Sequence, residues 1–222
     1  MSRQRLHPSI TDPSWLILRR RRALFTRWLE RFPGKDLEVL DVGGRLQPYR
    51  ELLQGRVKRY VALDLRATPA VDVVANAGKI PFMDDAFDIC FCTQMLEYAP
   101  NPQAVIAEIR RVLKPGGALL LSLPSLAPCD ASEDRWRFLP AAIRELLSVF
   151  SQIELVAEGS SATGFFRTLN VGLISLARFQ ALRTALRYTA VVLLNALGAL
   201  LESVSSGSNE SFAVNYSAIA RK

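Results

Sequence analysis

The stretch from Glu38 to Asp64 constrains the fold more than any other part of the chain. It reads EVLDVGGRLQPYRELLQGRVKRYVALD, in which a short apolar run ends in two glycines, a helical pattern follows, and a second apolar run ends in an acid. This order is typical of a nucleotide-binding crossover unit in a parallel sheet. Glycines let the chain turn sharply and let a ligand approach the backbone amides. The terminal acid is placed to accept hydrogen bonds from ribose hydroxyls.

The glycine turn alone leaves two interpretations open. It continues as Gly43-Gly44-Arg45-Leu46, so the later glycines of a complete dinucleotide-binding fingerprint are absent. An ordinary structural turn between a strand and a helix would also explain the paired glycines. The remaining motifs must decide between a ligand site and a plain turn.

Further apolar runs predict five more strands, at residues 71–75, 89–93, 118–123, 153–157 and 212–220. Residues 102–113 have the apolar spacing of a helix, and the segment Lys114-Pro115-Gly116-Gly117 is expected to end it. Strands that alternate with helices at short spacing form a parallel sheet covered on both faces. The sequence therefore predicts an α/β fold.

Length and cysteine content favour one cytoplasmic domain without a metal. The 222 residues suffice for a sizeable core, and no amino-terminal segment has the order of a secretory signal. Cys90 and Cys92 point to the same face of one apolar strand, and we interpret all three cysteines, including Cys129, as buried thiols. A metal site lacks further ligands because the only histidine is the distant His7.

The net charge of +7 is concentrated in the two flanks of the chain. Residues 1–35 carry +7, residues 36–164 carry −4 and residues 165–222 carry +4. A nucleic-acid groove usually needs a basic patch on the core itself, so we expect no nucleic-acid partner. Basic flanks around an acidic core fit an anionic membrane surface. Peripheral association with the inner membrane surface is therefore one expectation.

The basic amino-terminal region, residues 1–35, contains the amphipathic helix pattern WLILRRRRALFTRWLERF. Its apolar positions are Trp15, Leu18, Phe25, Trp28, Leu29 and Phe32. Three interpretations remain: a helix packed on the sheet with solvated arginines, a lid over a ligand, or a membrane-facing helix. Pro33-Gly34 is expected to end the helix before the first strand.

The main domain, residues 36–222, carries an apolar insertion at about 165–205, between its last two predicted strands. We expect a helical hairpin there that buries one face and offers another. The uncharged run from Tyr188 to Leu201 is shorter than the ~20 apolar residues that cross a bilayer. A hairpin on its own core, a homodimer interface and a membrane surface remain open alternatives. The segment SSGSNES is expected to lead the chain back to the sheet.

Four motifs together resemble one enzyme family. They are VLDVGG, VALD, IPFMDDAFDICFCTQMLEYAPNP and EIRRVLKPGGALLLSLP. The combination resembles the class I methyltransferases that use S-adenosylmethionine, in particular the group acting on small molecules and glycolipids, over about residues 36–158. The resemblance implies a three-layer, Rossmann-like fold whose sheet has seven strands with the last antiparallel. The insertion would interrupt the hairpin that joins the last two strands in this family.

The resemblance implies that the cofactor lies on the loops after the first four strands. The implied cofactor-binding residues are Asp41, Gly43, Gly44, Arg45, Asp64, Leu65, Asn76, Ala77, Thr93, Gln94 and Leu96. Asp41 and the glycines would hold the amino-acid end, and Asp64 would bind the ribose with Leu65 beside the adenine. Asn76 stands where relatives place an Asp that meets the adenine amine. The residues after the fourth strand would line the methionine moiety and the sulfonium.

Two positions depart from the family pattern. Arg45 replaces the usual second glycine, so its side chain either turns outward or crowds the cofactor. Tyr98 stands where many relatives have a histidine, so a histidine base is excluded there. Methyl transfer from a sulfonium can nevertheless run largely on proximity and alignment.

Candidate bases or substrate clamps are Tyr98, His7 and, in the cluster at residues 133–137, Asp134, Arg135 and Trp136. Each has a structural alternative. Tyr98 would then only pack or make a structural hydrogen bond, His7 would be a surface residue, and the cluster would be the ordinary start of a helix with an arginine paired to an acid.

The sequence thus predicts methyl transfer from S-adenosylmethionine, preferably to an oxygen of a small or lipid-linked acceptor. The chain lacks the N/D-P-P-Y/F tetrad that would grip a flipped base after the fourth strand, which argues against nucleic-acid methylation. The alternative is a protein that binds the cofactor but is catalytically silent and serves as a membrane-associated partner. The acceptor itself cannot be inferred from the fold.

Overall fold

The computed structural model describes residues 2–32, 34–129, 131–204 and 211–222. Contacts divide the chain into two compact units, one formed by Met1–Leu24 with Ala157–Asn215 and the other by Phe25–Val156 with Tyr216–Lys222. We call them the helical unit and the sheet unit and describe each by itself. The domain boundaries expected from the sequence stay a prediction.

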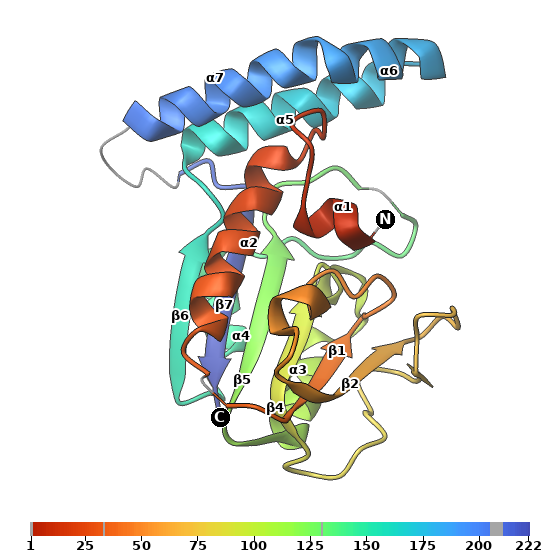
Figure 1. Cartoon of the computed structure of the whole chain (residues 1–222), viewed down its shortest axis with the longest axis vertical. Helices are drawn as coiled ribbons and strands as arrows, with labels where there is room; N and C mark the ends of the chain where they lie inside the picture. The colour runs from red at the N-terminus through yellow and green to blue at the C-terminus, as the bar shows by residue number, and fades with distance from the viewer. Residues whose placement is uncertain (1, 33, 130, 205–210) are drawn as a thin grey trace. The chain divides into compact units, whose positions relative to one another are not determined.

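The sheet has seven strands in the order β3-β2-β1-β4-β5-β7-β6. They are β1 (Leu37–Val42), β2 (Val57–Asp64), β3 (Val73–Val74), β4 (Phe87–Thr93), β5 (Leu113–Pro124), β6 (Gln152–Ala157) and β7 (Asn215–Arg221). The pairings among β1 to β5 are parallel, and β7 points the opposite way (Figure 1). The predicted Rossmann-like mixed sheet is therefore confirmed.

Local sequence explains the best-defined helix of the sheet unit, α3 (Pro102–Val112). Asn101 caps it, because its side-chain oxygen accepts a hydrogen bond from the Ala104 amide at 3.1 Å. The helix was expected to end in a turn at residues 114–117, but β5 already begins at Leu113. The reason is the chain end, since the Lys222 amide donates to the Gly117 carbonyl and keeps this stretch extended.

The helix expected between the first two strands is only one 3-10 turn, η1 (Arg50–Leu53). Pro48 disfavours helical geometry at the residue before it, and Gln47 has φ of +44°. The apolar spacing reflects burial, because Tyr49 and Leu53 lie in the core. The crossover is thus a compact loop. The other short elements of this unit are η2 (Leu96–Tyr98) and α4 (Pro140–Leu146).

The carboxyl-terminal part of α2 (Trp15–Leu29) packs on the core of the sheet unit. The Phe25 ring centre lies 4.7 Å from that of Tyr49 and 6.0 Å from that of Phe91. The Trp28 indole donates to Glu154 Oε1 at 2.9 Å. For this part of α2, the structure agrees with the interpretation of a helix packed on the core.

The helical unit contains α1 (Ser2–Leu6), the start of α2, α5 (Ser161–Leu176), α6 (Gln180–Tyr188) and α7 (Ala190–Val204). Figure 1 shows α5 beside α7, with α6 continuing the line of α7. The expected helical insertion is therefore present between β6 and β7. The expected linker lies largely outside the described residues.

One helical stretch of the described chain, Gln180–Val204, is long and apolar enough to cross a membrane by length and composition alone. The expectation from the sequence rested on the shorter run between Tyr188 and Leu201. The structure adds α6 to that run, and only Thr189 separates the two helices.

Candidate active site

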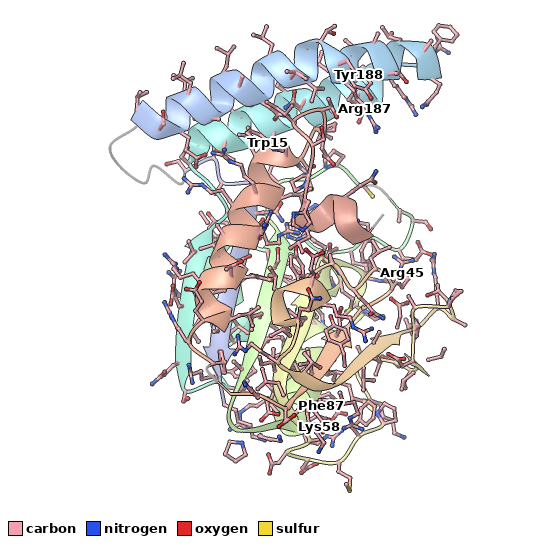
Figure 2. The ribbon with its side chains drawn as sticks, viewed as in Figure 1. Trp15, Arg45, Lys58, Phe87, Arg187 and Tyr188 are labelled. Atoms are coloured by element: carbon pink, nitrogen blue, oxygen red, sulfur yellow. The ribbon has the colours of Figure 1, made fainter. Side chains whose placement is uncertain are left out.

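The carboxyl ends of the parallel strands bring the predicted cofactor residues to one edge of the sheet. Val42 pairs with Leu63 on one side and with Cys92 on the other, so β1, β2 and β4 end at the same level. Figure 2 shows Arg45 at this edge, whereas Lys58 and Phe87 lie at the opposite end of the strands. Ligands of open parallel sheets bind at such an edge.

The glycine turn fits closely against its neighbours. Gly43 has φ of +80°, and a β-carbon there would lie 2.6 Å from Met95 Cγ. A β-carbon on Gly44 would lie 2.7 Å from the Asp41 carbonyl oxygen. Both glycine amides donate to the Leu63 carbonyl, at 2.8 and 3.1 Å. The protein itself thus fills the space that a side chain at either glycine would need, and the two amides hold β1 to β2.

Asp41 lies inside the sheet and is only 3% exposed. Burial raises the pKa of its carboxyl to about 6; the hydrogen bond from Tyr60 opposes this shift, and the charge of Asp64 adds to it. The Tyr60 hydroxyl donates to Asp41 Oδ2 at 2.7 Å. The first acid of the motif thus has a partner within the protein.

Arg45 reaches the carboxylate that was predicted to bind the ribose. Its Nε lies 3.4 Å from Asp64 Oδ2, with 47% of the Arg45 side chain and 13% of the Asp64 side chain exposed. The other carboxylate oxygen, Oδ1, accepts a hydrogen bond from the Arg66 amide at 2.9 Å. The Arg45 side chain is thus directed at the acid that was predicted to bind the ribose. A half-exposed ion pair stabilises by only about 0–1 kcal/mol, so a ligand can displace it.

The loops on the predicted adenine side are open. Leu65 is 67% exposed, which leaves an apolar surface next to Asp64. The Asn76 side-chain oxygen accepts a hydrogen bond from the Gly78 amide at 2.8 Å. Its predicted contact with the adenine amine would have to share or replace that bond. Ala77 is half-buried beside it.

After β4 the chain turns through Gln94, whose φ is +51°. The Gln94 side chain donates to Ser122 Oγ at 3.2 Å, and Thr93 is half-buried. Leu96 is fully buried in the core, and its place along the methionine moiety stays a prediction. The sequence analysis missed Met95, whose side chain covers Gly43, because a single methionine carries no pattern.

The two residues that flank Tyr98 contact the cluster at residues 133–137. The Glu97 carbonyl accepts hydrogen bonds from the amides of Arg135 and Trp136, at 2.8 and 3.1 Å. The Trp136 indole donates to the Ala99 carbonyl at 2.8 Å. The loops after β4 and β5 are thereby joined on either side of Tyr98.

Within this cluster, some residues are paired inside the protein and others are exposed to a possible acceptor. Asp134 Oδ2 accepts from Arg137 at 2.7 Å, and the same contact raises the pKa of Arg137. This supports the structural alternative for Asp134. Arg135 and Trp136 are exposed, and no carboxylate of the described residues pairs with the Arg135 guanidinium. They remain candidates for holding an acceptor.

His7 belongs to the helical unit, where its Nδ1 lies 2.9 Å from Arg22 Nη1. Burial raises the pKa of the Cys90 and Cys92 thiols well above the usual value, as expected for inert core cysteines. Cys129 is exposed, contrary to expectation, because it lies in the loop after β5. No group of three potential metal ligands occurs among the described residues.

One arginine explains why two of the recognised motifs occur together. Arg111, on α3, donates to the carbonyls of Ile80 and Phe82 and to the carboxylates of Asp84 and Glu108. The bonds to Glu108 and Asp84 raise the pKa of Arg111. The motif around residues 80–88 is therefore held to α3 and frames the site without entering it.

Comparisons with known proteins agree with the resemblance. A family profile described as "Methyltransferase domain" matches residues 40–121. Malonyl-[acyl-carrier protein] O-methyltransferase of Serratia marcescens is 28% identical over 192 residues, which cover 69% of this chain and 74% of that protein. A sterol 4-C-methyltransferase of Caenorhabditis elegans is 45% identical over 49 residues, covering 22% of this chain but only 15% of that protein.

Two solved structures show the same fold at low identity. The [4+2]-cyclase SpnF has a TM-score of 0.55 and 20% identity, with 90% of this chain and 80% of that chain covered. Phosphoethanolamine N-methyltransferase 2 of Haemonchus contortus, in complex with S-adenosylhomocysteine, has a TM-score of 0.53 and 16% identity, with 87% and 51% covered. The profile match and the Serratia relative indicate a class I methyltransferase, which uses S-adenosylmethionine as methyl donor, and the strand order and the two solved structures show the fold of that class.

Proposed function

We propose that this methyltransferase methylates an oxygen of a small or lipid-linked acceptor, and that this oxygen belongs to a carboxylate. The observation that carries the proposal is that four acids around the site each have a partner. Asp41 is bonded by Tyr60, Asp64 by Arg45, Glu133 by Arg66 and Asp134 by Arg137. None of these four is poised as a general base.

A carboxylate acceptor needs no such base. Its pKa of about 4 leaves it ionised at neutral pH, whereas a hydroxyl or an ammonium group must lose a proton before or during attack. Alignment of the oxygen is then the main contribution required from the protein. The exposed guanidinium of Arg135 and the indole face of Trp136 would provide a charge and an apolar surface for that alignment.

The residues present fit the methyl donor. The glycine turn at Gly43 and Gly44, the acid at Asp64 and the exposed apolar side chain of Leu65 follow the strands in the order that an amino-acid end, a ribose and an adenine require. When bound, S-adenosylmethionine supplies a methyl group on a positively charged sulfur. Binding requires Arg45 to leave Asp64 if both ribose hydroxyls are to reach the carboxylate.

The name of the Serratia relative adds support, since a malonyl group on a carrier protein presents a carboxylate. The sterol relative indicates a carbon acceptor instead, but it matches a much shorter stretch. We give oxygen transfer precedence because the longer alignment spans most of the chain.

The experiment compares three twelve-carbon acceptors that differ in the attacking group, together with a carrier-bound carboxylate. The protein is incubated with methyl-deuterated S-adenosylmethionine and, separately, lauric acid, dodecanol, dodecylamine and malonyl-acyl carrier protein. Methyl esters release labelled methanol in mild alkali, while methyl ethers and N-methyl or C-methyl products do not. We expect an alkali-labile label on lauric acid or the malonyl thioester. An alkali-stable product on the alcohol or the amine would overturn the carboxylate proposal.

The Arg45–Asp64 ion pair favours a second candidate, a catalytically silent protein that binds the cofactor and acts as a partner. Both candidates predict stabilisation by S-adenosylhomocysteine, about 2.7 kcal/mol at 100 times its Kd, or roughly 5 to 11 °C in Tm. NAD should give no shift. Transfer to any acceptor by the wild-type protein would exclude the silent alternative.

A further inference from the structure

The helices α5, α6 and α7 expose many large apolar side chains. Six of them are more than half exposed: Phe165, Leu176, Tyr188, Leu193, Leu200 and Val204. Figure 2 labels Tyr188 and its neighbour Arg187 near the junction of α6 and α7. Exposed apolar side chains that gather on a few neighbouring elements of a folded protein indicate an interaction site.

The buried residues of α5 and α7 are Thr163, Gly164, Phe166, Asn170, Val191, Asn195 and Gly198, and α6 has none. Asn170 and Asn195 are fully buried, and the Asn170 amide donates to the Asn195 side-chain oxygen at 2.9 Å. The Asn195 amide in turn donates to the carbonyls of Ile10 and Asp12, at 2.7 and 2.9 Å. A β-carbon on the buried Gly198 would lie 2.7 Å from a Leu16 methyl group.

Five of these seven buried residues are small or polar, while many large apolar side chains are exposed, which differs from the usual order of a water-soluble helical bundle. The same arrangement is found where helices pack in lipid, because lipid gives apolar side chains no reason to turn inward. The residue pattern of the helical unit therefore matches an apolar surrounding.

Length and charge agree with a lipid surface. Gln180–Val204 has 25 residues, and only 17% of its most apolar 18-residue window is buried. At ~1.5 Å per residue it is ~37 Å long, compared with ~30 Å for the hydrocarbon layer of a bilayer. Arg183 and Arg187 are exposed one turn apart on α6. The acid of α7, Glu202, is held by Arg20 at 2.7 Å.

We propose that α5, α6 and α7 form a membrane-binding module whose outward face enters a bilayer with anionic headgroups. The leucines of α7 contact the acyl chains, and the two arginines of α6 lie among the headgroups. A second copy of the chain fits less well, because its basic α6 would meet the same charges. The proposal concerns location and is independent of the acceptor and of catalysis.

The test is flotation of the full chain with vesicles of phosphatidylcholine alone or mixed with phosphatidylglycerol. We expect flotation with the mixed vesicles that decreases with salt. Leu193→Gln/Leu197→Gln/Leu200→Gln should lower binding at least tenfold. The matched control, Met83→Gln/Leu139→Gln/Val149→Gln, changes three exposed apolar side chains of the sheet unit and should bind as the wild type does.

A second variant tests the charges. Arg183→Gln/Arg187→Gln should reduce binding to mixed vesicles by about 30-fold, at about 1 kcal/mol per basic residue, and leave binding to neutral vesicles unchanged. Circular dichroism and the thermal shift with S-adenosylhomocysteine check that each variant is folded.

Two results would overturn the proposal. One is wild-type protein that stays at the bottom of the gradient with both kinds of vesicle at low salt. The other is a stable dimer in sedimentation that does not float and that the triple leucine variant converts to monomer. The second result would assign the apolar face to a homodimer.

Discussion

Arg45 Nε lies 3.4 Å from Asp64 Oδ2, so the acid that ends β2 is paired with the residue that follows the two glycines. Asp64 was predicted to bind the ribose of the cofactor, and Arg45 stands where relatives have a glycine. The departure at Arg45 therefore acts on the acid that was predicted to bind the ribose. A cofactor bound as predicted would compete with the arginine for this carboxylate.

Replacing Arg45 by Ala should strengthen binding of S-adenosylhomocysteine. An exposed ion pair contributes at most about 1 kcal/mol, so the expected gain is up to about fivefold in Kd, measured by calorimetry. Arg66→Ala is the control, because its side chain pairs with Glu133 while its amide still bonds Asp64. Weaker binding by Arg45→Ala would mean that the arginine itself holds the cofactor.

Replacing Asp64 by Ala should have the opposite effect. The loss of charge-assisted hydrogen bonds, at about 1.5–3 kcal/mol each, predicts at least a tenfold rise in Kd for S-adenosylhomocysteine with the fold retained. Glu133→Ala removes a nearby exposed acid and serves as the matched control. An unchanged Kd for Asp64→Ala would place the ribose elsewhere.

The strands were predictable because buried parallel strands are continuous apolar runs, and the residues that follow them mark the ligand edge. The runs at Val39–Val42 and Tyr60–Leu63 lie inside β1 and β2. The helix expected between them was wrong because apolar spacing does not distinguish a helix from a loop with two anchors, here Tyr49 and Leu53.

The rest depends on contacts between residues far apart in the chain. Nothing in the sequence places Met95 over Gly43, and nothing in it pairs Asn170 with Asn195. The buried ion pair between Arg21 and Glu158, at 2.8 Å, is of the same kind, because the run of four arginines indicated a solvated face. Such pairs result from tertiary packing, which the periodicity of apolar residues in a sequence does not predict.

Asp41 predicts a specific pH dependence of stability. Its pKa rises from 3.8 when unfolded to about 6 in the folded protein, so folding favours the protonated carboxyl. The contribution of the protonated carboxyl to the unfolding free energy is fully present below about pH 4 and is lost as the pH rises through about 6. Relative to Asp41→Asn, the wild type should lose roughly 3 kcal/mol of unfolding free energy between pH 4 and 7 in urea titrations.

Tyr60→Phe provides the control for this assignment. The hydrogen bond from Tyr60 lowers the pKa of Asp41. Removal of this bond should therefore move the loss of unfolding free energy to higher pH. A pH profile identical in the wild type and Asp41→Asn would show that Asp41 does not titrate in this window.

A comparison of alanine variants at Gly43 and Gly55 separates the energetic cost of backbone strain from that of a steric clash. Both have positive φ, +80° and +77°, but a β-carbon would collide with Met95 only at Gly43 and would meet nothing within 4 Å at Gly55. Gly55→Ala should therefore lower the unfolding free energy only by the strain of a left-handed backbone, about 1–2 kcal/mol in urea unfolding. Gly43→Ala should cost about 1–3 kcal/mol more. Equal costs for the two variants would mean that Met95 moves aside freely and does not shape the turn.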